Sequence, residues 1–405
     1  MSPAAIPTLQ NGHNRLAPAA QPIRITFVVT GLDVGGAEMM LWKLLSKMDR
    51  ARFDPSVISL SSSAIEMLPA FGRLGVRCEV LGWRAGHHAI TRMSALARTL
   101  RRLAPDIVQG WMYHGNIAAT VATRLARLNV PVLWNIRATL MERRHEKLGT
   151  ALMIRLGGLL SFSPARIINN SAASAAEHEG RRGYRASKRV ILPNGFDTDR
   201  FRPSAVARLA LRERLAVAED ALLIGLVARY HPMKDHASFL HAAALVARTH
   251  PEAQFVLAGE GASDSNPELA ALVAKHGLNR HVHMLGPRDD VQNVVAALDI
   301  QVSASSSGEG FPNVIGEAMS CGVPCVVTDV GDSATVIGDT GVSVPPRDPQ
   351  ALAAGMARLI ELGPEKRAEL GSRARARAIE AFSLDAVVRR YETLYRQLYD
   401  ERRSA

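Results

Sequence analysis

Two glutamates with seven residues between them, Glu309 and Glu317, flank a glycine-rich segment that follows a strand-like run ending near Ala304. Pro312 suits the first turn of a helix, because it lacks the N–H group that such a turn leaves unpaired. A helix that starts here directs free backbone amides toward the preceding loop, which creates an anion site. Glu317 then lies about one turn inside the helix, where its carboxylate can accept hydrogen bonds from a vicinal diol such as a ribose. Glu309 stays in the turn, nearer the reacting end.

Three other interpretations of this segment stay open. Gly308 and Gly310 can belong to an ordinary loop, with Glu317 on a solvated helix face. The glycines can also be a decayed dinucleotide-binding motif, with Asn313 in the place of its third glycine. The two glutamates can finally be the acid and base of a hydrolase. We favour contacts along one extended ligand, because one glutamate sits on a helix and the other on a loop of the same motif.

A second candidate loop carries two cations, Arg229 and Lys234, directly after the strand-like run of residues 222–227. A guanidinium fork and an ammonium at one loop can neutralise a pyrophosphate and stabilise it as it leaves. Most Lys and Arg residues are solvated surface cations, so that interpretation of the pair stays open beside the functional one.

The elements that must position these loops alternate between strand-like and helix-like segments in two series. The first series of strand-like runs covers residues 23–29, 55–60, 77–81, 107–109, 130–134 and 166–169, and the second covers 222–227, 254–258, 282–285, 300–304, 323–328 and 341–344. Pro193, Asn194 and Gly195 mark a turn between the series. This order predicts an α/β protein of two Rossmann-like domains that face each other across a cleft, with ligands beyond the carboxyl ends of the strands.

We expect a flexible lead-in over residues 1–20, an N-terminal domain over 21–195, a C-terminal domain over 196–380 and a final helix over 381–405 that packs back across both domains. The 405 residues carry a net charge of +11, which favours anionic partners. Nucleic acid is not expected, because no helix-turn-helix, zinc or RNA-binding aromatic motif accompanies the charge. Three cysteines are too few for a disulfide framework and indicate a reducing compartment. We expect neither a secretory signal nor a membrane-spanning run.

The ordered set of motifs resembles glycosyltransferase family four, the retaining enzymes of the GT-B fold. The resemblance spans roughly residues 23–398 and rests on segments in both halves of the chain. In the C-terminal half they are Arg229 with Lys234, then residues 258–261, 285–286, 309–317 and 321–324, and in the N-terminal half they are residues 31–38 and 192–197. Within the family, residues 109–116 most resemble bacterial enzymes that build cell-surface polysaccharides.

The resemblance implies roles for individual residues. Arg229 and Lys234 would hold the donor's phosphates, Glu317 the ribose hydroxyls and Glu309 a hydroxyl of the transferred sugar, while His114 would touch that sugar near the reacting centre. Together, Arg229, Lys234, Glu309 and His114 form the expected catalytic set. The expected donor-binding set adds Gly35 and Gly36, which let the first loop approach the diphosphate, Arg288 near the nucleobase, and Gly310, Phe311, Asn313 and Val314 along the sugar and phosphate. Arg137 and Tyr113 are the candidate acceptor contacts.

The resemblance implies that the N-terminal domain holds the acceptor and the C-terminal domain a nucleotide-diphosphate sugar, and that the sugar is transferred with retention. No metal and no cofactor are expected, because no Asp-x-Asp pair appears where a metal would be needed. The acceptor would be a saccharide or a lipid-linked saccharide, reached from the cytoplasm at the inner face of the plasma membrane. The alternatives are a nucleotide-sugar epimerase of GT-B fold and a noncatalytic membrane-surface protein with a degenerate GT-B fold.

Basic residues concentrate in the N-terminal half, with Leu and Met between them. They are Arg92, Arg98, Arg101, Arg102, Arg137, Arg143, Arg144, Lys147 and Arg155. An amphipathic face rich in arginine can lie on the anionic headgroups of a membrane surface. A solvated helix face is the alternative.

Overall fold

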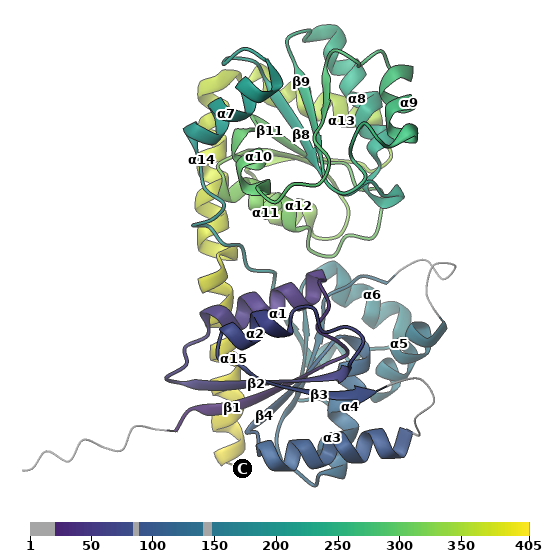
Figure 1. Cartoon of the computed structure of the whole chain (residues 1–405), viewed down its shortest axis with the longest axis vertical. Helices are drawn as coiled ribbons and strands as arrows, with labels where there is room; N and C mark the ends of the chain where they lie inside the picture. The colour runs from purple at the N-terminus through teal and green to yellow at the C-terminus, as the bar shows by residue number, and fades with distance from the viewer. Residues whose placement is uncertain (1–20, 84–88, 141–147, 405) are drawn as a thin grey trace, which may run out of the picture.

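The computed structural model describes residues 21–83, 89–140 and 148–404, which form two α/β domains (Figure 1). The expected lead-in over 1–20 and the cations Arg143, Arg144 and Lys147 lie outside the described residues. The N-terminal domain holds a parallel sheet with strand order β3-β2-β1-β4-β5-β6-β7. Its strands are β1 (Ile23–Val29), β2 (Phe53–Ser61), β3 (Arg77–Trp83), β4 (Ile107–Trp111), β5 (Val132–Ile136), β6 (Arg166–Asn169) and β7 (Arg189–Ile191).

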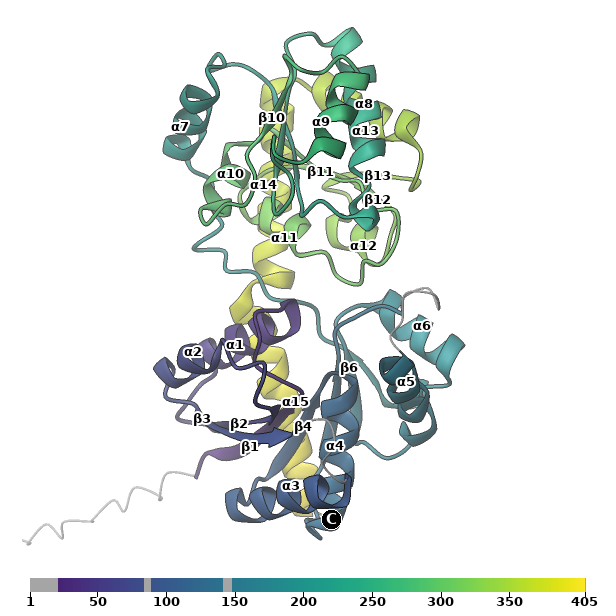
Figure 2. The same ribbon diagram turned by 45° about the vertical axis from the view of Figure 1, so that its right-hand side comes forward.

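Helices cover both faces of this sheet. They are α1 (Gly36–Lys47), α2 (Leu68–Arg73), α3 (Ala89–Leu103), α4 (Met112–Leu125), α5 (Leu148–Leu160) and α6 (Ala172–Arg182), with a 3₁₀ turn η1 (Ala186–Lys188). The helices α3, α4, α5 and α6 follow one another on one face, and α1 and α2 lie on the other (Figures 1 and 2). This distribution follows from right-handed crossovers on a sheet whose strand order reverses at β1.

The C-terminal domain repeats the architecture with a six-stranded parallel sheet of order β10-β9-β8-β11-β12-β13. Its strands are β8 (Leu223–Val227), β9 (Gln254–Ala258), β10 (Val282–Met284), β11 (Ile300–Ser303), β12 (Cys325–Thr328) and β13 (Gly341–Val344). Its helices are α7 (Ala205–Leu215), the 3₁₀ turn η2 (Pro232–Lys234), α8 (His236–Thr249), α9 (Pro267–Lys275), α10 (Val291–Ala297), α11 (Asn313–Ser320), α12 (Ser333–Ile337), α13 (Pro349–Glu361) and α14 (Gly363–Phe382).

The predicted fold class is confirmed. Every strand-like run of the sequence forms a strand, because buried strands of a parallel sheet need apolar side chains on both faces. Phe27 and Ile25 of β1, and Phe255 and Val256 of β9, are completely buried. Burial of side chains of this size stabilises each domain by roughly 1.5–3 kcal/mol apiece. The edge strand β7 was not expected, since its three residues are too few for a periodic pattern.

The last helix, α15 (Leu384–Ser404), packs on the N-terminal domain. Its apolar stripe joins the core beneath β1 and β4 and includes Leu384, Val387, Tyr391, Leu394, Tyr395 and Leu398. The Tyr395 hydroxyl donates to Oε1 of Gln109 at 2.6 Å. The C-terminal domain is covered by α14 instead, so it is the pair α14 and α15, rather than the final helix alone, that extends over both domains (Figure 2).

The chain crosses between the domains twice, and the two crossings lie side by side. Phe196 of the first crossing forms a parallel bridge with Ser383 of the second. The Phe196 amide donates to the Phe382 carbonyl, and the Leu384 amide donates to the Phe196 carbonyl, both at 2.8 Å. The rings of Phe311 and Phe382 pack on Phe196 and fill the junction.

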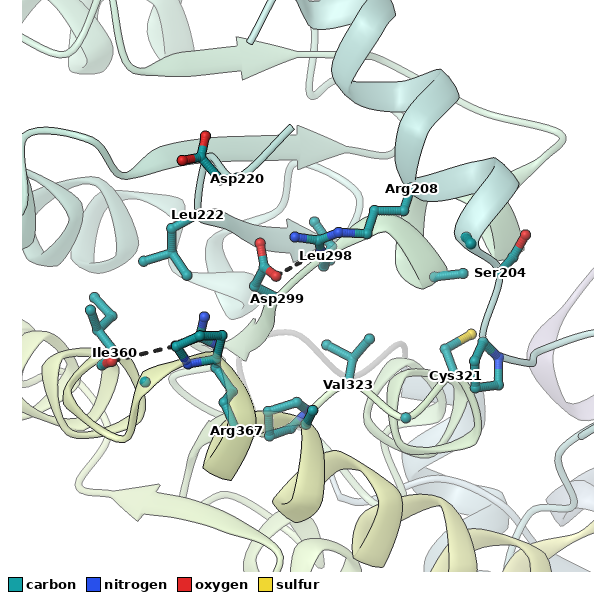
Figure 3. A pocket seen from close by; sticks show the side chains of 18 of the residues that line it. Ser204, Arg208, Asp220, Leu222, Leu298, Asp299, Cys321, Val323, Ile360 and Arg367 are labelled. Atoms are coloured by element: carbon teal, nitrogen blue, oxygen red, sulfur yellow. Dashed lines mark hydrogen bonds and ion pairs between the residues drawn. The ribbon is translucent and has the colours of Figure 1, made fainter. Parts of the chain in front are cut away.

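A charged network closes the edge of the C-terminal sheet that lies opposite the carboxyl ends of its strands. Asp299 accepts from Arg208 and Arg212 at 2.7 Å each, and from the Leu223 amide at 2.8 Å. Beside it opens a cavity of about 700 Å³ into which Arg367 also projects (Figure 3). Arg212 is 1% exposed, so water no longer solvates its guanidinium. The Asp299 carboxylate compensates this buried positive charge.

Candidate functional site

The two candidate loops of the sequence meet at one point of the C-terminal sheet. Arg229 and Lys234 follow β8, and the segment of Glu309 and Glu317 follows β11. The strands β8 and β11 are hydrogen-bonded neighbours, and the strand order reverses between them. Loops at such a reversal diverge to opposite faces of the sheet and leave a crevice for a ligand. This edge, with α11 and α12, faces α1 and α6 of the other domain (Figure 1).

Lys234 is held in place by local turn chemistry. It ends the 3₁₀ turn η2, and Asp235 follows with φ of 47°. The Asp235 carboxylate caps α8 by accepting from the amide and the hydroxyl of Ser238, at 3.1 and 2.7 Å. Pro232 starts the turn with its fixed φ. The turn therefore projects Lys234 from a rigid base.

The side chain of Lys234 forms an ion pair with Glu309, whose Oε1 atom it contacts. Ser305 donates its hydroxyl to the same oxygen at 2.7 Å. The Ser306 amide donates to the Met233 carbonyl at 2.8 Å, which ties the two loops together. The Lys234 and Glu309 side chains are 24% and 11% exposed, so the pair is partly shielded from solvent.

Arg229 lies on the same loop but is exposed. Within the part of the chain that the structure describes, no acidic side chain pairs with its guanidinium. Among the described residues, Lys234 is thus the cation of this loop that has an acidic partner, and Arg229 is exposed without one.

The start of α11 is built as the sequence predicts, with Pro312 at the N-cap and no side chain that caps the helix. The amides of Asn313 and Val314 therefore begin a helix of eight residues without a side-chain partner. Phe311 is 8% exposed and stacks on Phe196, with ring centroids 5.9 Å apart. Gly310 approaches the other domain closely, because a Cβ there would lie 3.5 Å from Oδ1 of Asn170.

Glu317 lies in the second turn of α11, on the face that receives the field of Lys43 from α1 and of Arg200. Burial raises the pKa of its carboxyl, and the two cations oppose that shift. Among the hydrogen bonds of the described residues, none goes to this carboxylate. Glu317 therefore keeps its acceptor capacity for a bound group.

The N-terminal domain contributes Gly35 and Gly36 at the start of α1 and His114 at the start of α4. A Cβ at Gly36 would meet nothing within 4 Å, so packing does not require a glycine there and the space is open to a ligand. At Gly35 the contact would be the flexible end of Glu38. His114 is exposed, although neighbouring groups desolvate it enough to lower the pKa of its imidazole.

Two of the expected site residues, Tyr113 and Arg288, direct their side chains to partners within their own domain. Tyr113 is 7% exposed, and its hydroxyl lies 2.9 Å from Nε2 of His178 in the core, so its expected role as an acceptor contact is wrong. The physical reason is that α4 starts at Met112, directly after β4, with φ of 62°, and its first turn directs Tyr113 inward and His114 outward. The Arg288 side chain pairs with Asp290 at 2.7 Å, which leaves its backbone for the expected nucleobase contact.

Arg137 lies at the junction of the domains. One of its Nη atoms donates to the Tyr391 hydroxyl at 3.0 Å, the other donates to Oδ1 of Asn194, and its guanidinium lies 5.4 Å from the centre of the Trp111 ring. These partners are neutral, and among the described residues no acidic side chain pairs with Arg137, so it brings a positive charge to the junction of the domains. It is fixed in place more firmly than the sequence indicates.

Three polar residues join the domains near the loop before α11 and α6, and sequence reasoning gave none of them a contact, although it placed Asn194 in the turn between the domains. Thr139 donates to the Gly308 carbonyl at 3.1 Å, Asn194 donates to the Phe311 carbonyl at 3.3 Å, and Asp332 accepts from two amides of α6. Each follows a strand at its carboxyl end, which is the one signal that could have found them. Within the described residues, no cluster of three or more His, Cys, Asp or Glu side chains could hold a metal ion.

Comparison with known proteins agrees with this geometry. Residues 34–200 match the family model of Glycosyltransferase Family 4, and residues 221–362 match that of Glycosyl transferases group 1. The chain is 27% identical over 313 residues to the putative glycosyltransferase EpsF of Bacillus subtilis, covering 76% of this chain and 79% of EpsF. It is 31% identical over 256 residues to the D-inositol 3-phosphate glycosyltransferase of Kineococcus radiotolerans, covering 58% of each chain.

Solved structures show the same fold. HepE of Anabaena, in a complex with UDP, superposes with a TM-score of 0.80 at 24% identity over 92% of this chain and 99% of that one. Sucrose-phosphate synthase of Thermosynechococcus elongatus superposes with a TM-score of 0.73 at 20% identity over 94% and 100%. Two parallel Rossmann-like sheets with a site at their facing edges define the GT-B class. With its two matching domain models, the chain belongs to the family-four-like GT-B glycosyltransferases.

Proposed function

We propose that this glycosyltransferase moves a sugar, with retention of its anomeric configuration, from a nucleotide-diphosphate sugar to a saccharide or lipid-linked acceptor. The observation that carries the proposal is the fixed pair of Lys234 and Glu309 beside the uncapped start of α11. A diphosphate bound there would contact the cations of the loop after β8 and the free backbone amides at the start of α11. The sugar attached to it would lie within reach of the Glu309 carboxylate.

The chemistry follows from where charge develops. When the sugar's anomeric bond breaks, negative charge grows on the departing diphosphate. We propose that Arg229, Lys234 and the amides of Asn313 and Val314 stabilise that charge. Pre-positioned donors such as Lys234 and the two amides are worth roughly 3–4 kcal/mol each in a dry site. We propose that these groups do so without a metal ion or another cofactor.

We propose that the Glu309 carboxylate binds a hydroxyl of the transferred sugar. Its Oε1 atom is occupied by Lys234 and Ser305. Its Oε2 atom has no partner among the described residues and can accept a sugar hydroxyl. We propose that His114, exposed at the start of α4, contacts the sugar from the other domain, and its lowered pKa leaves a neutral imidazole that can both donate and accept at neutral pH.

A transfer assay tests the proposal. UDP-glucose and UDP-galactose are the first donors to try, because the related HepE fold was solved with UDP and with UDP-glucose. Release of UDP should depend on an added saccharide acceptor and persist in EDTA, and proton NMR of the product should show the donor's configuration. Conversion of the donor without any acceptor would indicate an epimerase. The absence of a nucleotide-induced shift in melting temperature would indicate a noncatalytic protein.

We further propose that the enzyme works at the cytoplasmic surface of the plasma membrane through α3, α4 and α5. None of these three helices contains Asp or Glu, although Arg98, Arg101 and Arg155 are exposed on them. Large apolar side chains share this face and are exposed by 82% at Ile90, 61% at Leu152, 75% at Leu159 and 53% at Phe162. Leu152, Arg155 and Leu159 recur at the three- and four-residue spacing of one stripe of α5, and Phe162 lies in the turn directly after that helix.

This face differs from the one that charge alone suggests. Arg102 pairs with Glu79 at 2.9 Å, and Arg137 lies in the cleft, so neither contributes fully to a basic surface. Within the described residues, no helix is both long and apolar enough to cross a membrane. A positive apolar stripe without acids is suited to lie at the headgroup boundary of an anionic bilayer.

Sedimentation with vesicles containing phosphatidylglycerol tests the membrane proposal. The double change Leu159→Ser with Phe162→Ser should reduce binding at least tenfold, and high salt should weaken what remains. Val206→Ser is the matched control, because Val206 is 78% exposed on α7 of the other domain. Equal sedimentation of the double variant and the parent protein would contradict the assignment.

A further inference from the structure

Asp332 of the C-terminal domain caps a helix of the N-terminal domain. Its two carboxylate oxygens accept from the Ala172 and Ala173 amides of α6 at 2.8 and 2.9 Å. Asp332 stands at the N-cap of α12, but it makes no side-chain hydrogen bond to that helix. Its side chain serves the opposite domain only, and Asp332 is 6% exposed in that position.

The start of α6 is incomplete without this residue. Ser171 caps the helix from within its own domain by accepting from the Ser174 amide at 2.9 Å. That bond leaves the amides of Ala172 and Ala173, the first two of the helix, without a partner from the described part of the N-terminal domain. Asp332 supplies both, and its negative charge interacts favourably with the positive end of the helix dipole.

Asp332 is also part of the backbone that shapes the turn of Glu309. Its amide donates to the Gly310 carbonyl at 2.9 Å. Gly331, directly before it, has φ of 64°, and a Cβ there would lie 2.3 Å from the Glu309 carbonyl oxygen. A glycine is required at this close approach, so the chain from Gly331 to Asp332 and the turn from Glu309 to Gly310 move as one unit.

We propose that Asp332 is a positioning residue that couples the contact between the domains to the orientation of Glu309. When Asp332 engages α6, the turn of Glu309 is fixed relative to the N-terminal domain and to His114 on it. When the domains separate, the hydrogen bonds between the Asp332 carboxylate and the two amides of α6 break, and water solvates these groups. The role of Glu309 toward the sugar rests on the proposed function, whereas the coupling itself does not.

Two variants break the same bonds from opposite sides. Asp332→Asn keeps the size of the side chain but replaces one acceptor oxygen by an NH₂ group that faces an amide N–H. Ala172→Pro removes one of the two donor amides at the first position of α6, where proline is tolerated. Asp348→Asn is the matched control, because Asp348 caps α13 by accepting from the Ala351 amide at 2.9 Å within one domain.

Small-angle X-ray scattering of the ligand-free protein measures the coupling without turnover. Asp332→Asn and Ala172→Pro should each increase the radius of gyration, and the double variant should add little beyond either one, because both remove the same contact. Asp348→Asn should leave the radius unchanged. An unchanged radius in both single variants, with melting curves that show folded protein, would overturn the proposal.

Kinetics supply the second arm. Because the proposed donor contacts lie mainly in the C-terminal domain, the Kd for UDP in Asp332→Asn should stay within about twofold while kcat falls about tenfold or more, as expected for lost charge-assisted bonds. Asp332→Glu, which retains two oxygens, should recover part of kcat. Parent-like kcat in Asp332→Asn would overturn the proposal. A parent protein that binds no nucleotide would contradict the proposed function and leave the scattering test intact.

Discussion

Lys234 and Glu309 are joined by an ion pair although 75 positions separate them in the chain, and the Ser305 hydroxyl donates to the same carboxylate oxygen. Each side chain orients the other before a ligand arrives. Under the proposed function, order of this kind lowers the cost of reorganisation during reaction, since the Lys234 ammonium would already stand where the charge of the leaving group develops. Removing Lys234 or Glu309 therefore leaves the other side chain without its ion-pair partner.

Replacing Lys234 by Ala should lower kcat/KM by roughly 10²–10³, the loss typical for one pre-positioned donor to a developing charge. Arg229→Ala should have a smaller effect, because Arg229 is exposed, has no acidic partner among the described residues and must be ordered when the donor binds. Steady-state kinetics with a saturating acceptor provide the measurement. Lys275→Ala is the control, as Lys275 is an exposed lysine of the same domain at the end of α9. Parent-like kcat/KM in Lys234→Ala would remove this residue from the mechanism.

The assignment of Glu317 to the ribose can be tested with a modified ligand. Glu317→Ala should weaken UDP binding about tenfold to a hundredfold, as expected for lost hydrogen bonds to a charged group. The parent enzyme should also lose affinity for 2′-deoxy-UDP, whereas the variant should bind UDP and 2′-deoxy-UDP nearly equally. Isothermal titration calorimetry provides the four dissociation constants. A deoxy penalty that survives in the variant would refute the contact.

Asp299→Ala should destabilise the C-terminal domain by roughly 3–5 kcal/mol, because it leaves the buried Arg212 guanidinium without its counter-charge. Denaturant unfolding followed by circular dichroism measures the change. Asp339→Ala breaks an ion pair with Arg373 in which the two side chains are 75% and 52% exposed, and it should cost at most about 1 kcal/mol. Similar losses in the two variants would show that burial does not decide the effect.

Stability should fall in mild acid. Burial lowers the pKa of His178 and of His236 to about 4, from an ordinary value of 6.5. Between these values the unfolded chain binds more protons than the native protein, so the free energy of unfolding decreases as pH falls from about 6.5 to about 4 and is flat above. Each histidine contributes a slope of at most about 1.4 kcal/mol per pH unit. His178→Phe should reduce the slope measured in urea titrations, and an unchanged slope would contradict the burial argument.

The sequence predicted those features that depend on local pattern. The strands β6, β9 and β13 have the bounds that their apolar runs indicate, and α11 starts beside Pro312 as its lack of an N–H group suggests. Tyr113 was misplaced because a helix that begins without a connecting loop changes which side chain faces the cleft. The φ angle of Met112, which the periodicity of apolar residues does not encode, determines which side chain of this turn points inward.

Contacts between the domains could not be predicted. Asp332, Thr139 and Asn194 resemble ordinary loop residues, and their partners are 160, 169 and 117 positions away. Whether a loop carboxylate faces solvent or a helix of another domain depends on how two folded bodies meet, and no spacing within either body reports that. The loops of Arg229 with Lys234 and of Glu309 with Glu317 could be located, because each motif follows a single strand, and the roles of these residues stay predictions.

The paired crossings at Phe196 and Ser383 limit how the two lobes can move. Since both covalent connections run through this one junction, the two domains can rotate about it as a hinge but cannot slide freely past each other. Small adjustments of these two backbone segments would then be amplified with distance from the junction, toward the facing edges of the domains where we propose that donor and acceptor meet. A substitution that stiffens this junction would change kcat, although the replaced residue contacts no group that binds the sugar.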